Sequence, residues 1–172
     1  MDIRTATLAD IPAIAALVNA AYRGESSRAG WTTEADLLDG QRVDIEGLAA
    51  TIATPDNVIL VFGEPQEPVG CVHLQRQGND CYLGMLTIRP TAQGAGLGSW
   101  LLEAAERWAA VHWSSRSMHM TVIEQRAALI AWYERRGYHR TGEQRPFPYG
   151  DPRFGLPRRD DLAFDVLRKP LC

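Results

Sequence analysis

The sequence of 172 residues lacks the features of several protein classes. Its cysteines show no Cys-x-x-Cys pair, which argues against a disulfide framework or a zinc site and indicates free thiols at Cys71, Cys81 and Cys172. No apolar run approaches the ~20 residues of a membrane-spanning helix. The segment Met1-Asp2-Ile3-Arg4 has no hydrophobic signal core. We therefore expect a cytoplasmic protein with no membrane partner.

The sequence also lacks a surplus of either charge. Eighteen Lys and Arg stand against 21 Asp and Glu, giving a net charge of −3. This balance gives no electrostatic basis for binding nucleic acid. The apolar content of 45% is ordinary, and no repeat or low-complexity stretch is present. A single domain over residues 1–172 is the simplest expectation.

Glycine is concentrated in the stretch Gln93-Gly94-Ala95-Gly96-Leu97-Gly98, here called the glycine turn. It lies between an apolar strand pattern that ends at Ile88 and a helical pattern over 97–111. Unpaired backbone N–H groups at a helix N-terminus, with the helix dipole behind them, favour a phosphate or pyrophosphate. The alternative is a tight turn that needs positive φ.

The spacing excludes two common phosphate motifs. Walker A requires Lys followed by Ser or Thr, whereas Gly98 is followed by Ser99-Trp100. A dinucleotide fingerprint requires a third glycine where Ser99 stands. The pattern Gln/Arg-x-x-Gly-x-Gly/Ala is matched by Gln93, Gly96 and Gly98. In its strand–turn–helix context it resembles the acyl-CoA-binding motif of the GNAT N-acetyltransferase superfamily.

The remaining patterns predict the fold class. Helices are expected over 8–22, 45–53, 97–111 and 127–136, with a short helix over 34–38 that Thr33 caps. Strands are expected over 3–6, 58–62, 69–77, 81–88, 117–123, 138–141 and 162–167, and a proline-rich loop over 145–159. This order predicts an α+β domain with three α/β/α layers: a mixed, mostly antiparallel sheet of six to seven strands flanked by about four helices. The GNAT fold has the same order.

A second motif resembles the family. Tyr133, Gly137 and Tyr138 match its Tyr-x-x-x-Gly-Phe pattern, whereas Arg126 stands where the family usually has Asn and Leu129 where it has a small residue. The resemblance implies that Tyr133 protonates the departing CoA thiolate and that Tyr138 packs. A tyrosine on the apolar face of a helix is otherwise a core residue.

The resemblance further implies acetyl-CoA as co-substrate and no metal. The pantetheine arm would pair with the strand end at 85–88, where the N–H of Met85 or Leu86 would polarise the thioester carbonyl. The pyrophosphate would lie on the N–H groups of the glycine turn. The implied cofactor-binding residues are Met85, Leu86, Thr87, Ile88, Gln93, Gly94, Ala95, Gly96, Leu97, Gly98, Ser99 and Arg126.

Attack of an amine on a thioester also needs a proton acceptor. Glu124 follows the strand at 117–123 and would lie near the glycine turn if the neighbouring strands are parallel, so it is the carboxylate candidate. A solvated surface residue is the alternative. His73 and His119 offer a water-mediated relay, or they are hydrogen-bonded structural residues.

The acceptor site is expected in the polar region 23–42, which walls the acceptor pocket in GNAT proteins. Trp31 and Arg28 are the predicted substrate-binding residues. Arg23, Arg28 and Arg42 suggest an acceptor with a carboxylate, and the alternatives are a core plug at Trp31 and solvated arginines.

The predicted function is transfer of an acetyl group from acetyl-CoA directly to a primary amine of a small molecule or protein, with a homodimer left open. Direct transfer is expected because Cys71 and Cys81 have no His-Asp partners in the sequence pattern. One alternative is a non-catalytic acyl-CoA sensor or interaction module on the same fold. The other is a nucleotide-binding oxidoreductase with Glu124 on a ribose.

Overall fold

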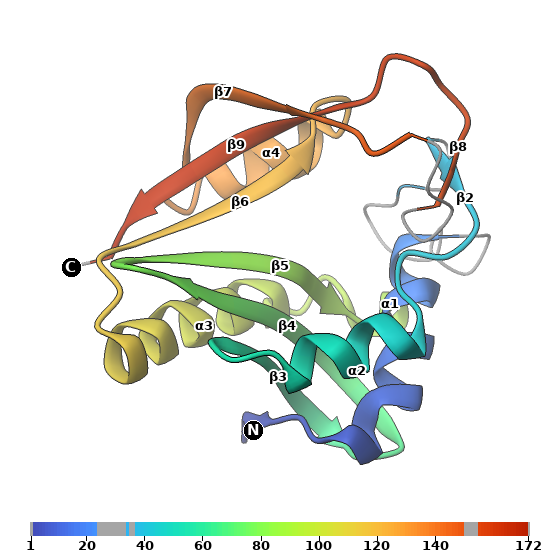
Figure 1. The fold of residues 1–172 in the computed structure, drawn as a ribbon, viewed down its shortest axis with the longest axis vertical. Helices are drawn as coiled ribbons and strands as arrows, with labels where there is room; N and C mark the ends of the chain where they lie inside the picture. The colour runs from blue at the N-terminus through green and yellow to red at the C-terminus, as the bar shows by residue number, and fades with distance from the viewer. Residues whose placement is uncertain (1, 24–33, 35–36, 150–154, 172) are drawn as a thin grey trace.

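The computed structural model describes residues 2–23, 34, 37–149 and 155–171 (Figure 1). Seven strands form one sheet in the order β1-β3-β4-β5-β6-β9-β7. All neighbours in it are antiparallel except β5 and β6, which are parallel. The strands are β1 (Arg4–Thr5), β3 (Asn57–Glu64), β4 (Glu67–Gln77), β5 (Asp80–Ile88), β6 (Ser117–Ile123), β7 (His139–Pro146) and β9 (Ala163–Pro170).

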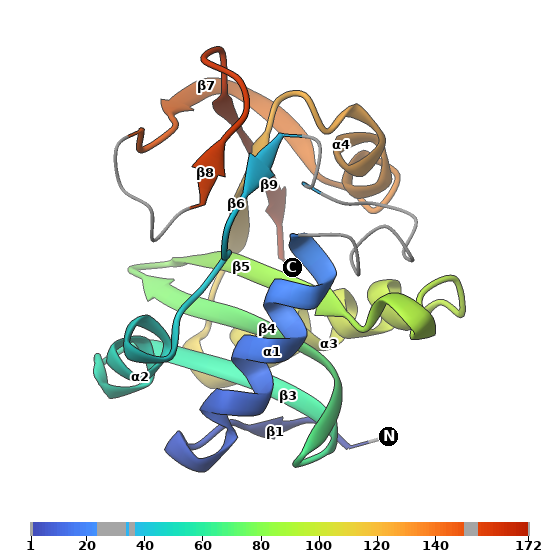
Figure 2. The ribbon, with the colours of Figure 1, turned by 90° about the vertical axis from the view of Figure 1, so that its right-hand side faces the viewer.

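Helices cover both faces of the sheet, and each face has its own apolar core. On one face lie α1 (Ile11–Tyr22), which follows a 3₁₀ turn at Leu8–Asp10, and α2 (Ile45–Ala53) (Figure 2). On the other lie α3 (Leu97–Trp113) and α4 (Ala127–Glu134), whose buried residues share a core with β4, β5 and β6. The predicted mixed three-layer α+β class is confirmed.

Several local predictions differ from the structure. The strand predicted over 138–141 is β7 (His139–Pro146), which continues into the predicted loop because it pairs with β9 as far as Pro146. Leu38 was expected at the end of a short helix but begins β2 (Leu38–Asp39). This strand pairs with β8 (Leu156–Pro157), which lies in the segment expected to be only loop. Pairing between two short segments that lie far apart in one chain leaves no local sequence pattern. Within the described residues, no helix has the length and apolarity needed to cross a bilayer.

The sheet opens between β5 and β6, and this opening positions the site. The two strands pair only over Asp80–Tyr82 and Ser117–His119, after which they run apart (Figure 1). A β-bulge follows in β5, because the register with β4 shifts between Cys71 and His73. Met85 takes φ 58° at this bulge. Bulges leave backbone groups outside the regular ladder, so the end of β5 presents an open edge toward β6.

Candidate functional site

The glycine turn joins β5 to α3 in a conformation that exposes its backbone. Gly94 and Gly96 take φ values of 88° and 78°, which favour glycine. A Cβ on either would meet nothing within 4 Å, so the space beside them is open. No side chain caps α3, and the N–H groups of 94–99 donate no hydrogen bond within the described chain. Both readings of the turn therefore apply: it requires positive φ, and it has the free donors of an anion site.

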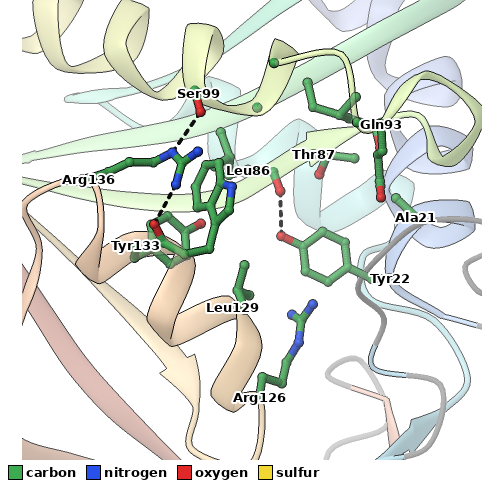
Figure 3. A pocket seen from close by; sticks show the side chains of 15 residues that line it. Ala21, Tyr22, Leu86, Thr87, Gln93, Ser99, Arg126, Leu129, Tyr133 and Arg136 are labelled. Atoms are coloured by element: carbon green, nitrogen blue, oxygen red, sulfur yellow. Dashed lines mark hydrogen bonds between the residues drawn. The ribbon is translucent and has the colours of Figure 1, made fainter.

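An arginine that the sequence reasoning did not single out lies beside these donors. Arg136 stacks on the Trp132 ring at 3.8 Å and donates from Nε to Ser99 Oγ at 2.8 Å (Figure 3). Its Nη1 donates to the Trp132 carbonyl at 2.8 Å. Trp132 also packs against Gly98, where an added Cβ would lie 3.3 Å from the indole. Two motifs far apart in sequence thus join to place a fixed cation at the start of α3.

A cavity of about 280 Å³ extends from the glycine turn along the end of β5 to α4, and we call it the glycine-turn pocket. Most of the predicted cofactor-binding residues line it, whereas Met85, Ala95 and Leu97 do not. Its lining consists of Ala21, Tyr22, Leu86, Thr87, Ile88, Gln93, Gly94, Gly96, Gly98, Ser99, Arg126, Leu129, Trp132, Tyr133 and Arg136.

A second cavity, of about 260 Å³, lies on the β6 side of the opening, and we call it the arginine pocket. Met85, Arg23, Glu34 and Arg42 line it. The two pockets share one wall, so they adjoin at the open edge of β5. The shared residues are Tyr22, Leu86, Arg126, Leu129 and Tyr133.

Tyr22 and Tyr133 stand at this junction from opposite sides. The Tyr22 hydroxyl donates to the Leu86 carbonyl at 2.7 Å (Figure 3). Tyr133 is buried, and its ring packs edge-on against Trp132 and Tyr138. Its hydroxyl makes no hydrogen bond within the part of the chain that the structure describes. Burial raises the pKa of Tyr133 well above its usual value, so the hydroxyl keeps its proton at neutral pH.

A buried ion cluster forms one side of the arginine pocket. Arg23 Nη2 and Nε lie 2.7 and 2.9 Å from Glu34 Oε1, and Arg126 Nη1 lies 3.1 Å from Oε2. Burial alone would favour the neutral carboxyl, but Arg126, Arg23 and Arg42 outweigh it and lower the pKa of Glu34. A carboxylate held in this way remains ionised and is a weak base.

The carboxylate and histidines considered as proton acceptors lie elsewhere. Glu124 accepts a hydrogen bond from Gln144 at 2.8 Å and lines neither pocket. His73 bonds Asn57 at 2.8 Å, and burial lowers its pKa to about 4. His119 Nδ1 lies 2.6 Å from Asp80, where β5 and β6 are still paired. These groups are therefore not brought to the junction, because strand direction and divergence carry them away.

Other predicted residues can be placed briefly. Trp31 and Arg28 lie outside the described residues. Cys71 and Cys81 are free and buried, and burial raises the pKa of each thiol to about 12, so neither is a ready nucleophile. In the described ranges, no group of three or more His, Cys, Asp and Glu residues is arranged to hold a metal ion.

Several solved structures of similar fold are named as N-acetyltransferases. An alanine N-acetyltransferase for ribosomal protein from Escherichia coli is 16% identical, with a TM-score of 0.71 over 99% of this chain and 93% of that chain. The ribosomal-protein-alanine N-acetyltransferase of Brucella melitensis is 22% identical, with a TM-score of 0.67 over 99% and 100%. A mutant spermidine N-acetyltransferase from Vibrio cholerae is 14% identical, with a TM-score of 0.68 over 99% and 95%. At these identities the likeness establishes the fold.

Sequence comparison supplies the family. No curated protein matches the chain. The sequence model of the acetyltransferase (GNAT) family matches residues 15–138, which include the glycine turn and the helix that carries Tyr133. This match covers more than half of the chain. The protein is therefore a member of the acetyltransferase (GNAT) family.

Proposed function

We propose that this protein is an N-acetyltransferase that moves an acetyl group from acetyl-CoA directly to a primary amine. The observation that carries the proposal is the junction of the two pockets. The open edge of β5 and the protonated Tyr133 of α4 face both pockets there, and the glycine-turn pocket continues from them to the row of free N–H groups at the glycine turn. A two-substrate reaction needs two sites that meet, and the two adjoining pockets support this proposal.

The glycine-turn pocket is the proposed donor site. The N–H groups of 94–99 suit a pyrophosphate, and Arg136 adds a positive charge beside them. The pantetheine arm would lie along the edge of β5 as an added strand, with the Leu86 carbonyl as one acceptor. Tyr22 donates to that carbonyl at present, so binding there would compete with its hydrogen bond.

Tyr133 is the proposed proton donor to the departing sulfur. The amine nitrogen bonds to the thioester carbon, the C–S bond breaks, and the sulfur receives a proton. Because the pKa of Tyr133 is raised above that of a thiol (~8.5), a tyrosinate cannot accumulate. The hydroxyl therefore stabilises the developing thiolate as a hydrogen-bond donor. If its proton passes fully to the sulfur, the phenol oxygen regains a proton from the attacking nitrogen, which carries one proton more than the product amide.

The amine must first lose its own proton. In the described part of the two pockets, Glu34 is the only carboxylate, and its arginine partners hold it ionised. We therefore propose water as the immediate proton acceptor and assign Glu124 no catalytic role, because it bonds Gln144 outside both pockets. Trp31 and Arg28 remain predicted acceptor-binding residues, and the cytoplasmic location remains a prediction.

A thiol-release assay tests the proposal. The protein is mixed with acetyl-CoA and a panel of primary amines, and free CoA is followed together with the mass of the acetylated product. Amine-dependent release with a matching product is expected. If calorimetry shows acetyl-CoA binding but no amine is acetylated, the protein is a non-catalytic acyl-CoA module and the proposal fails. Tighter binding of a nicotinamide dinucleotide than of acetyl-CoA would contradict it as well.

A further inference from the structure

We propose that the acceptor of this reaction is amino-acid-like: a small primary amine that also carries an anionic carboxylate and an apolar body. This inference rests on the proposed function, because it concerns the second substrate of the same site. The named acceptors of the structural neighbours, ribosomal-protein alanine and spermidine, differ in charge and size, so the relatives do not decide it. The arginine pocket itself supplies the argument.

The described lining of the arginine pocket holds three guanidinium groups, on Arg23, Arg42 and Arg126, and one carboxylate, on Glu34. Both Glu34 oxygens are used, Oε1 by Arg23 and Oε2 by Arg126. This described lining therefore has a surplus of positive charge. An anionic ligand would neutralise this charge, and a polyamine would be repelled by it.

Arg42 carries this surplus of positive charge. Its guanidinium lies 5.5 Å from the centre of the Tyr22 ring and has no carboxylate partner among the described residues. Arg42 is half-buried, so a ligand can reach it. A planar guanidinium recognises a carboxylate through two parallel hydrogen bonds. Its backbone N–H bonds Asn19 Oδ1 at 2.7 Å, which fixes the start of the side chain.

The positively charged side chains also lie close to the open edge of β5. The guanidinium of Arg126 also lies 5.5 Å from the centre of the Tyr22 ring, so Arg42 and Arg126 both contact this ring. The Tyr22 hydroxyl in turn bonds Leu86 at the open edge of β5. The positive groups thus stand on the acceptor side of the junction at which the thioester would react. A ligand with its carboxylate at Arg42 could direct a nearby amine toward that edge.

The other wall of the arginine pocket is mostly apolar and aromatic, and the cavity of about 260 Å³ is small. A cavity of this size lies just below the range of about 300–1,000 Å³ for small-molecule sites, so it suits a small ligand. The apolar wall consists of Leu83, Met85, Met120, Val122, Phe147 and Phe164. A carboxylate, an amine and an apolar side chain on one small molecule match this combination.

Matched pairs of acceptors test the inference. Leucine and phenylalanine are compared with leucinamide and phenylalaninamide, which keep the shape and lose the negative charge, and spermidine serves as a cationic acceptor. Because the carboxamide alters the pKa of the amine, full pH profiles are recorded and kcat/KM is expressed per neutral amine. We expect the carboxylates to exceed their amides by about tenfold or more, the scale of a charge-assisted pair. Equal or better use of the amides or of spermidine overturns the inference.

Arg42→Gln supplies the residue-specific test. It leaves the partners of Glu34 in place, and its melting temperature is measured to confirm folding. We expect the carboxylate-to-amide ratio to fall toward one, mainly through the KM of the carboxylate. Arg107→Gln is the matched control, because Arg107 is exposed on α3 outside both pockets. A ratio that Arg42→Gln leaves unchanged overturns the inference.

The two proposals fail in different ways. If amides or polyamines are acetylated as well as the carboxylates or better, the proposed transferase function stands and the acceptor class is wrong. If acetyl-CoA does not bind, or no amine of any class is acetylated, the function itself fails. As an independent readout, 3-phenylpropanoate should inhibit competitively against the acceptor, whereas 3-phenylpropanamide should not. Equal inhibition by the two contradicts recognition of the negative charge.

Discussion

Replacing Tyr133 by phenylalanine removes one oxygen atom from the junction of the two pockets and keeps the ring. The ring contacts with Trp132 and Tyr138 remain, at centroid distances of 5.0 and 5.8 Å. Because the hydroxyl makes no hydrogen bond within the described chain, its loss leaves no protein partner unsatisfied. The free energy of unfolding should therefore change by less than about 1 kcal/mol.

The effect on catalysis should be much larger than the effect on stability. Loss of a positioned proton donor typically slows a reaction by roughly 10²-fold or more. A factor of 10² corresponds to about 2.7 kcal/mol of transition-state free energy. We expect this loss in kcat for Tyr133→Phe, measured by thiol release on the best amine found. Acetyl-CoA affinity by calorimetry should be nearly unchanged.

The pH dependence provides a check on the mechanism. The raised pKa of Tyr133 keeps the wild-type hydroxyl protonated through about pH 9, so its titration should produce no fall in rate there. The wild-type rate should instead rise with pH as the amine loses its proton. The defect of Tyr133→Phe should stay constant or narrow above the thiol pKa of ~8.5, where sulfur leaves readily as thiolate. If Tyr133→Phe keeps the wild-type kcat from about pH 6 to 9, the Tyr133 hydroxyl has no catalytic role and the ring only packs.

Three further predictions concern binding and stability. Gly96→Asp should weaken acetyl-CoA binding at least ~10-fold relative to Gly96→Asn, which has nearly the same shape and tolerates the φ of 78°; equal affinities in calorimetry would contradict the anion site. Glu34→Gln removes the negative charge between two buried arginines, so chemical denaturation should show a loss of about 3–5 kcal/mol, and an unchanged midpoint would contradict the ion cluster. Asp10→Asn should cost about 1–3 kcal/mol at neutral pH, because hydrogen bonds from Arg4 lower the pKa of Asp10 to about 2. A depressed carboxyl pKa stabilises the fold above the unfolded value of ~3.9, so the advantage of the wild type should vanish between about pH 4 and 2, and a constant difference across that range would show another origin.

Local patterns were sufficient for much of the fold. The predicted bounds of α2 and β6 coincide with the observed ones, because apolar periodicity and stop residues act over a few positions. The bulge in β5 was not predicted. It requires φ 58° at a methionine, a residue that carries no turn signal, and its register is set by pairing with β4.

The site was less predictable than the fold, because its contacts join distant parts of the chain. Arg136 reaches Ser99 across 37 positions, and Arg126 reaches Glu34 across 92. Neither pairing follows from spacing within a motif. Glu124 was chosen for its place at the end of a strand, but its carboxylate accepts a hydrogen bond from Gln144 of β7, two strands away in the sheet. Sequence identified the motif residues, and packing selected their charged neighbours.

The divergence of β5 and β6 also bears on self-association of this protein through exposed strand edges. An unpaired apolar strand edge is ordinarily where a second chain attaches, and it favours aggregation. Here the unpaired part of β5 lies inside the sheet, between β4 and β6 of the same chain, and not at an outer edge. The outermost strands are poor templates, since β1 spans two residues and β7 is exposed, charged and ends in proline. Among the described residues, neither outer strand thus offers a long apolar edge to a second copy of the chain.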